Sequence, residues 1–230
     1  MLVTALVTQQ DGKTTHPINT YYDCLEKLVT IGLPILLFYS SKLQLPDSIL
    51  RPNVILRPID FEGLPLYHYY LGCKTLLPAH GNPQKDTFDY LVIQNSKTFF
   101  AASAAHTYPA EPLFMWVDAG LLRIMQDVEA ALEMFKVIHD CPEPRITIPG
   151  CNGWPARLVF DSVNWYFCGG LFVGKAPALI EFHSLCMDII VGIRPYITWE
   201  VNIWAEVARH RPELFNRYLA DHNDSILANY

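Results

Sequence analysis

The stretch Pro112-Leu-Phe-Met-Trp-Val117, which runs directly into Asp118-Ala-Gly120, decides the fold of this 230-residue chain. Five apolar residues in a row, bounded by a proline and an aspartate, are typical of a strand that is buried on both faces of a sheet. Asp118 then stands at the carboxyl end of that strand, the edge where open α/β sheets bind ligands. The stretch therefore predicts an α/β fold with a candidate functional residue at Asp118.

Further elements follow from the same kind of pattern. Apolar runs predict strands over residues 2–7, 34–39, 53–59 and 166–173. Helical periods predict helices over residues 18–31, 88–106, 128–139, 177–193 and 198–211. Residues 146–148 and 156–160 favour a hairpin or an edge pair, and residues 61–86 read as irregular. The alternation predicts a mostly parallel central sheet flanked by helices, in a single domain over residues 1–230.

Composition narrows the function classes. The chain is 51% hydrophobic and carries a net charge of −6, with no cluster of Lys and Arg, so nucleic-acid binding is not expected. It lacks a signal-peptide pattern and an uncharged apolar run of about 18 residues, which predicts a cytoplasmic protein without a transmembrane segment. The six cysteines are scattered without zinc-type spacing and are predicted to be reduced, structural thiols.

Three residues in the middle and late parts of the chain have charged side chains suited to a site. Asp118 either binds a metal or the ribose and diphosphate of a nucleotide, or caps the segment that begins at Gly120. Lys97 either offers positive charge to a leaving diphosphate or is a solvated surface lysine. Glu200, in the first turn of a helix capped by Thr198, either acts as a general base or partners the helix dipole.

A polar cluster near the C-terminus offers possible metal ligands. Carboxylates and an imidazole at Asp221, His222 and Asp224 suit Mg²⁺ or Mn²⁺, and a solvated turn is the alternative. The pair Gly169-Gly170, preceded by Trp165, either forms the floor of an acceptor-sugar site or allows tight packing. Four histidines have no evident partners and are given no role: His16, His68, His80 and His106.

No P-loop, dinucleotide-binding glycine motif or nucleophile elbow is present. The chain resembles the HtrL/YibB-like (WlaX-like) family over most of its length. The segments that carry the resemblance are Phe114-Met-Trp-Val-Asp-Ala-Gly120, Ser96-Lys97, Gly169-Gly170, Glu200 and the run 221–230. Members of that family are associated with polysaccharide gene clusters and look like GT-A glycosyltransferases. The resemblance implies a nucleotide-diphosphate sugar donor, a glycan or other hydroxyl acceptor, and Mn²⁺ or Mg²⁺ as cofactor.

The resemblance also assigns roles to residues. In GT-A enzymes an Asp-x-Asp motif holds the metal and the diphosphate; Asp118 matches its first aspartate, and Gly120 stands where the second belongs. Asp221 or His222 would then complete the metal site, and Glu200 would lie near the acceptor as the catalytic acidic residue. The residues implied for binding the donor nucleotide are Thr4, Ala5, Thr8, Lys97, Asp118 and Gly120.

Three hypotheses follow. The leading one is a glycosyltransferase in polysaccharide biosynthesis, with inversion if Glu200 acts as base and without that role if the configuration is retained. The second is a non-catalytic carbohydrate- or nucleotide-binding module on a degenerate transferase scaffold, suggested by the missing second aspartate. The third is a metal-dependent hydrolase that uses Asp118, Asp221 and His222.

Overall fold

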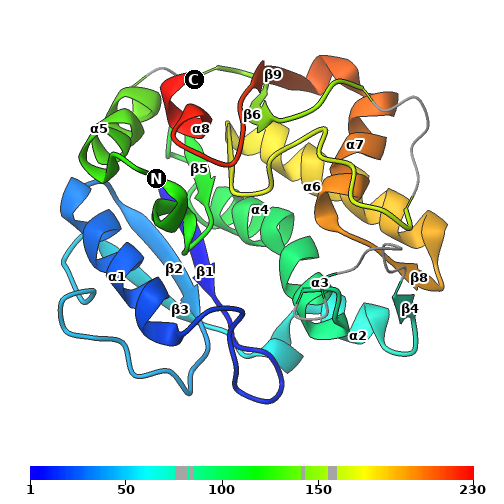
Figure 1. The fold of residues 1–230 in the computed structure, drawn as a ribbon, viewed down its shortest axis with the longest axis horizontal. Coiled ribbons are helices and arrows are strands. Elements are labelled where there is room, and N and C mark those ends of the chain that lie inside the picture. Colours follow the sequence, from blue (N-terminus) through cyan, green and yellow to red (C-terminus); the bar gives the residue numbers. More distant parts are fainter. Residues whose placement is uncertain (76–81, 83–84, 141–142, 155–159) are drawn as a thin grey trace.

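The central element is a seven-stranded sheet in the order β3-β2-β1-β5-β7-β6-β9 (Figure 1). The computed structural model describes residues 1–75, 82, 85–140, 143–154 and 160–230. The strands of the sheet are β1 Leu2–Leu6, β2 Ile35–Tyr39, β3 Val54–Pro58, β5 Phe114–Val117, β6 Ile146–Gly150, β7 Leu171–Gly174 and β9 Phe215–Leu219. Two short parallel strands, β4 Lys74–Thr75 and β8 Tyr196–Ile197, pair separately.

Strand direction brings distant segments to one edge of this sheet. Strands β3, β2, β1 and β5 pair in parallel, β7 runs antiparallel to both β5 and β6, and β6 pairs in parallel with β9. Every strand except β7 therefore points the same way. The carboxyl ends of six strands and the amino end of β7 consequently lie at one edge, which confirms the predicted mostly parallel α/β class.

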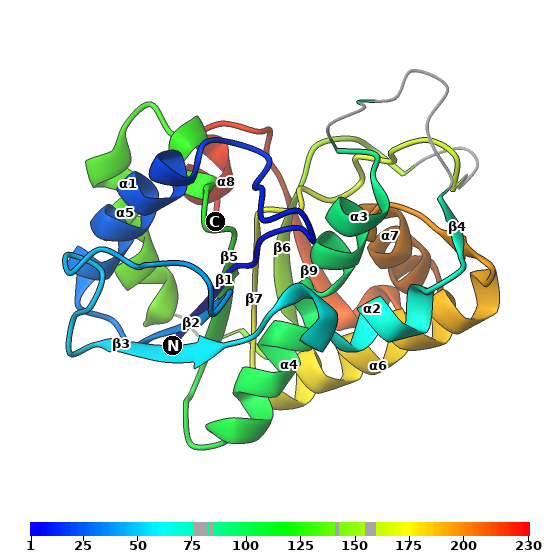
Figure 2. The same ribbon diagram turned by 90° about the horizontal axis from the view of Figure 1, so that it is seen from below.

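Helices cover both faces of the sheet (Figure 2). One face packs mainly against α4 Lys97–Thr107, α6 Ala176–Ile193 and α7 Glu200–His210, and the other against α1 Ile18–Leu28, α5 Val128–His139 and α8 Ser225–Ala228. The remaining helices are α2 Pro65–Tyr70, α3 Phe88–Asn95 and four 3₁₀ turns, Val29–Ile31, Phe61–Gly63, Leu121–Ile124 and Pro212–Leu214. Each buried strand thus feeds alternate side chains into two hydrophobic layers.

Several elements differ from the expectations. Residues 40–53 connect β2 to β3 by turns. The helix expected over residues 88–106 is divided into α3 and α4 at Ser96, whose hydroxyl bonds the Val92 carbonyl, a contact that bends helices. β7 begins only at Leu171, and β9 was not expected because its polar side chains hide the apolar pattern of a strand. Residues 155–159 of the expected hairpin lie outside the described residues.

An aromatic stack holds the sheet to the α6 and α7 layer. Trp116 of β5 stacks between Phe100 of α4 and Phe172 of β7, with ring centroids 5.7 and 6.2 Å apart. Phe172 also meets Phe182 and Trp204 edge-on at 5.8 and 5.4 Å. Such ring pairs add to the free energy gained from burial. The stack fixes β5, and with it Asp118, against the helices.

One helix among the described residues, α6, has the length and apolar composition that could cross a membrane, with a mean hydropathy of 1.5. Core helices of soluble proteins pass the same test, so this is a weak indication. Here α6 contacts α4 and α7. The helix expected over residues 177–193 is therefore present and packs one side against the fold, but only 28% of its apolar window is buried and Val191 is exposed.

Truncating Phe172, which is fully buried, tests the aromatic stack. We expect Phe172→Ala to lower the free energy of unfolding by about 3–5 kcal/mol, because a cavity replaces contacts to three rings. Chemical denaturation measures the change. The control Val137→Ala truncates an exposed residue of α5 and should shift stability by less than about 0.5 kcal/mol. Equal effects of the two substitutions would contradict the stack's importance.

Candidate active site

A cavity of about 220 Å³ opens at the edge of the sheet where the parallel strands end. Segments that are far apart in sequence line it, including the end of β1, the residues after β5, the segment before β7 and the start of α7. The lining residues with polar or aromatic side chains are Gln9, Lys13, Thr14, Thr15, His16, Tyr21, Lys85, Tyr90, Gln94, Lys97, Phe100, Trp116, Asp118, Arg123, Trp165, Trp199, Glu200 and His222. The cavity is thus lined by polar, charged and aromatic side chains together.

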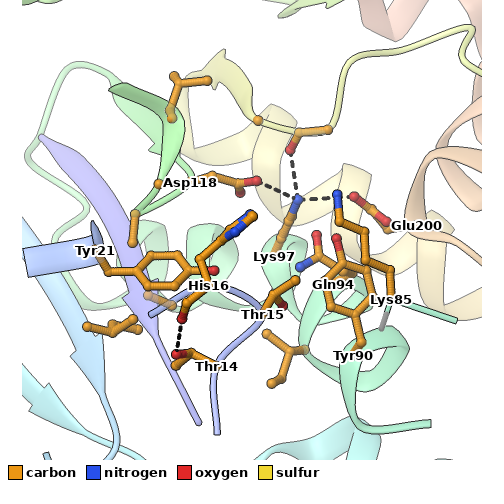
Figure 3. A pocket seen from close by; sticks show the side chains of 18 of the residues that line it. Thr14, Thr15, His16, Tyr21, Lys85, Tyr90, Gln94, Lys97, Asp118 and Glu200 are labelled. Carbon is orange, nitrogen blue, oxygen red and sulfur yellow. Dashed lines mark hydrogen bonds and ion pairs between the residues drawn. The ribbon is translucent and has the colours of Figure 1, made fainter. Parts of the chain in front are cut away.

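A buried lysine lies at the floor of this cavity. The Lys97 side chain is only 4% exposed, and its Nζ donates to Asp118 Oδ2, Glu200 Oε1 and the Gly169 carbonyl, each at 3.0 Å (Figure 3). An ammonium group has three N–H bonds, so all of them are used. Burial by itself would lower the pKa of Lys97, but the two carboxylates outweigh it and raise this pKa. The interpretation of Lys97 as a solvated surface lysine is therefore wrong.

Asp118 is held by two donors and still reaches the cavity. Its Oδ1 accepts a 2.8 Å bond from Trp116 Nε1 and its Oδ2 accepts the bond from Lys97. The side chain remains 32% exposed, and each carboxylate oxygen can accept a second hydrogen bond. The backbone at Gly120 forms the N-cap of the next 3₁₀ turn without a side-chain bond, so Asp118 does not cap it. The Asp118 carboxylate is therefore fixed in position and faces the cavity.

Glu200 contributes the second carboxylate, from the first turn of α7. It is 2% exposed, and among the described residues its Oε2 has no hydrogen-bond partner. The N-cap of α7 is Trp199 rather than Thr198, because the Thr198 hydroxyl donates to the Phe160 carbonyl and accepts from Asn202. Glu200 lines the cavity, and its buried Oε2 carries a desolvation cost that a hydrogen bond from a ligand would relieve.

Close packing explains the glycine pair before β7. A Cβ atom added at Gly169 would lie 2.5 Å from Glu200 Oε1 and 3.3 Å from Lys97 Nζ, and one at Gly170 would lie 2.9 Å from Leu121. Only glycine fits at position 169, because a larger side chain would collide with the Lys97–Glu200 ion pair. Of the two alternatives for this pair, the geometry favours tight packing at Gly169, while both glycines also line the cavity.

Cationic side chains gather around the cavity although the chain is acidic overall. Lys13, Lys85 and Arg123 line it together with His16. Burial, followed by the charges of Arg123 and Lys85, lowers the pKa of His16, which reports the positive potential there. Burial and the charges of Glu200 and Asp118 raise the pKa of Tyr90, which also lines the cavity. The cavity thus has the cations Lys13, Lys85 and Arg123 around it and the carboxylates of Asp118 and Glu200, both bonded to Lys97, at its floor.

Other residues implied for the donor lie in different positions. Ala5 and Gly120 line the cavity, whereas Thr4 and Thr8 are buried and are absent from its lining. Thr8 bonds Ser40 through its amide and its hydroxyl, and Thr4 Oγ1 has no partner among the described residues. His16, which the sequence left without a role, lies in the cavity wall. The charged neighbours that act on it, Arg123 and Lys85, come from distant segments, so the local sequence does not indicate its place in the cavity.

The described side chains do not gather the oxygen-rich cluster expected for Mg²⁺ or Mn²⁺. His222 lines the same cavity as Asp118, but Asp221 is 73% exposed and pairs at 3.6 Å with His222 Nδ1. Asp224 bonds the backbone amide of Gln126, as the turn interpretation expects. Both Asp118 oxygens already accept hydrogen bonds, and Gly120 adds no carboxylate. Among the described residues, Asp118, Asp221 and His222 therefore do not form one ligand group, and a metal requirement stays a prediction.

A second group of side chains adjoins the cavity at His222. Cys151 Sγ lies 2.7 Å from Cys168 Sγ and 3.5 Å from His222 Nδ1. The bond from the Cys168 thiol and the neighbouring imidazole lower the pKa of Cys151 to about 5. The same bond, together with burial, raises the pKa of Cys168. Seventeen residues separate the two cysteines in sequence, so no local motif marks this group, which we call the thiol–imidazole cluster.

Comparisons with known proteins show a likeness in structure alone. No protein-family model matches the chain, and the search of curated proteins found no match. A solved structure described as a glycosyltransferase involved in the glycosylation of the major capsid of PBCV-1 aligns with 95% of this chain and 82% of its own. The sequence identity is 10% and the TM-score is 0.43. A likeness this low carries no argument for function, which must be based on the cavity.

The charge balance at Lys97 gives a stability prediction. We expect Lys97→Met to lower the free energy of unfolding by about 3–5 kcal/mol, because it leaves the Glu200 carboxylate buried without its partner. Adding Glu200→Gln to that variant should restore about 1–3 kcal/mol. Because the folded-state pKa of Lys97 is raised above 10.5, its contribution is present below that pH and is lost as the pH rises through the raised value.

Urea denaturation of wild type, both single variants and the double variant, at neutral pH and above pH 10.5, measures these changes. The control Lys42→Met removes an exposed lysine and should change stability by less than about 0.5 kcal/mol. Strictly additive effects of Lys97→Met and Glu200→Gln would show that the two side chains are not coupled.

Proposed function

We propose that this chain is a glycosyltransferase that moves a sugar from a nucleotide-diphosphate donor to a hydroxyl group of a glycan or another acceptor. The observation that carries the proposal is the charge arrangement of the cavity, which has Lys85 and Arg123 on its rim and two fixed carboxylates below them. A diphosphate needs cations around it, and a sugar and an acceptor hydroxyl need carboxylate acceptors. Involvement in polysaccharide biosynthesis and a cytoplasmic location stay predictions.

The roles in the transfer follow from the position of each group. Lys97 has no N–H left for the donor, so its role is to hold Asp118 and Glu200 in place, and the rim cations neutralise the diphosphate. Asp118 accepts a hydrogen bond from a donor hydroxyl through its remaining lone pairs. Aromatic walls at Tyr21 and Trp165 offer faces for the base or a sugar ring. This assignment replaces direct contact between Lys97 and the leaving diphosphate.

Glu200 Oε2 is the proton acceptor in this scheme. As the acceptor oxygen forms its bond to the anomeric carbon, the hydroxyl proton passes to Glu200 and the bond from that carbon to the diphosphate breaks. The diphosphate leaves with the electron pair of that bond and is neutralised by the rim cations. A base on the acceptor side of a single displacement inverts the anomeric configuration. The proposal therefore includes inversion.

A non-catalytic binding module is the second candidate. It is favoured by Gly120, which provides no second carboxylate after Asp118. Both candidates bind a nucleotide diphosphate, but only a transferase turns its donor over. Slow hydrolysis of a nucleotide sugar in the absence of acceptor therefore separates them.

Donor binding depends on the rim cations. We expect wild type to bind at least one nucleoside diphosphate in a calorimetric panel, and Lys85→Ala and Arg123→Ala each to weaken that binding about tenfold or more, because each removes a charged partner. Lys42→Ala, which removes an exposed lysine that does not line the cavity, should bind as wild type does. Failure of folded wild type to bind any diphosphate, with or without Mn²⁺, would refute the proposal.

Turnover depends on Glu200. We expect Glu200→Gln to lower donor hydrolysis and transfer by about 10²–10⁴-fold, because the amide cannot take the proton, while diphosphate affinity changes little because the amide oxygen still accepts from Lys97. Product NMR reads the anomeric configuration, and parallel assays with EDTA and Mn²⁺ test the predicted cofactor. Full activity of Glu200→Gln, or a retained configuration, would contradict its role as base.

A further inference from the structure

The thiol–imidazole cluster of Cys151, Cys168 and His222 lies where three neighbouring strands meet the ligand-binding edge. Cys151 directly follows β6, and backbone bonds on both sides of that strand fix the other two residues. The Cys168 amide donates to the Pro149 carbonyl at 2.8 Å, and the Ala220 amide donates to the Gly150 carbonyl at 3.0 Å, two residues before His222. The convergence is therefore set by the sheet rather than by flexible side chains.

The three candidate ligand atoms all lie within 4.8 Å of one another, and no other trio of His, Cys, Asp or Glu in the described part of the chain does so. Cys151 Sγ and His222 Nδ1 are 3.5 Å apart, the separation of two ligands on one tetrahedral zinc ion. The two sulfurs are 2.7 Å apart and would separate by about 1 Å on metal binding, which corresponds to zinc–sulfur bonds of about 2.3 Å. Cys151, half-buried after the strand end, has room for that movement.

The donor chemistry selects the ion. Two thiolates and an imidazole are soft to borderline ligands, which favour Zn²⁺ over Mg²⁺, Mn²⁺ or Ca²⁺. Burial is graded across the group: Cys168 is fully buried, Cys151 is half-buried and the His222 side chain is 44% exposed. Three protein ligands with one open side match the zinc sites that keep a position for water or substrate.

We propose that Cys151 Sγ, Cys168 Sγ and His222 Nδ1 bind one Zn²⁺ ion, with a water or ligand oxygen in the fourth position. Because His222 also lines the cavity that holds Asp118, the ion lies beside the proposed donor site. Asp221 Oδ1, 3.6 Å from Nδ1, pairs with this imidazole when the metal is absent. The site is separate from the Mg²⁺ or Mn²⁺ expected at Asp118, and its existence does not depend on glycosyl transfer.

Zinc binding to the full chain tests the site. After chelator treatment in a phosphine reductant, the protein is titrated with Zn²⁺ against a chromophoric chelator. We expect one equivalent to bind, and the loss of one ligand in Cys151→Ser or in His222→Ala to weaken binding on the order of 100-fold. His222 is exposed, so its truncation leaves the fold intact. Cys73→Ser, which changes a half-buried cysteine outside the cluster, should bind zinc as wild type does.

Cobalt substitution identifies the ligands independently of affinity. Co²⁺ should give the intense visible bands of a tetrahedral ion and a thiolate-to-metal charge-transfer band that falls by about half in Cys151→Ser. Reduced wild type that takes up no zinc, or loses none of its affinity in the ligand variants, overturns the proposal. A Cys151–Cys168 disulfide in protein that binds no zinc when reduced also overturns it and identifies the pair as a redox couple.

Discussion

The buried Lys97 ammonium is the interaction on which the rest of this structure depends. It lies at the first position of α4 and bonds the end of β5, the segment before β7 and the start of α7. Burying a charge is costly unless it is paired and fully hydrogen-bonded, and here each of its three N–H bonds meets an acceptor. A cation at a helix N-terminus is also opposed by the helix dipole, so the two carboxylates offset both terms.

This clamp explains features around it that otherwise look unrelated. Position 169 requires glycine because a Cβ atom there would collide with Glu200 Oε1, and the Gly169 carbonyl accepts a hydrogen bond from Lys97. The break between α3 and α4 at Ser96 allows α4 to begin at Lys97, beneath the cavity. Trp116 bonds Asp118 through its indole while its ring is stacked in the core, which ties the carboxylate's position to the packing of the sheet. The candidate active site is therefore positioned by groups that are themselves buried.

The reversed strand β7 determines what meets at the edge of the sheet where the cavity lies. Because β7 alone runs against its neighbours, its amino end joins the carboxyl ends of β5, β6 and β9. The residues before β7, Cys168 to Gly170, consequently lie among groups that follow other strands, namely Asp118, Cys151 and His222. The Lys97 clamp and the thiol–imidazole cluster are two products of this one topological feature.

The sequence by itself determined the α/β class, most element positions and the place of Asp118 at the end of a buried strand, because local apolar patterns report burial on each strand and helix. The helix over residues 128–139 was predicted with the bounds the structure has. The fold also brings together Asp118, Lys97 and Glu200, which the sequence had singled out separately. What local patterns could not give were the helix break at Ser96 and the strand β9, whose polar residues follow no apolar period.

Only the tertiary structure decided that Lys97 is buried, that Gly169 accommodates an ion pair, and that Cys151, Cys168 and His222 converge. A lysine is read as exposed in any pattern of hydrophobicity, since its burial depends on partners 21 and 103 residues away. The gathering of cations around an anionic floor likewise depends on strand order and direction, which hydrophobic periodicity does not encode.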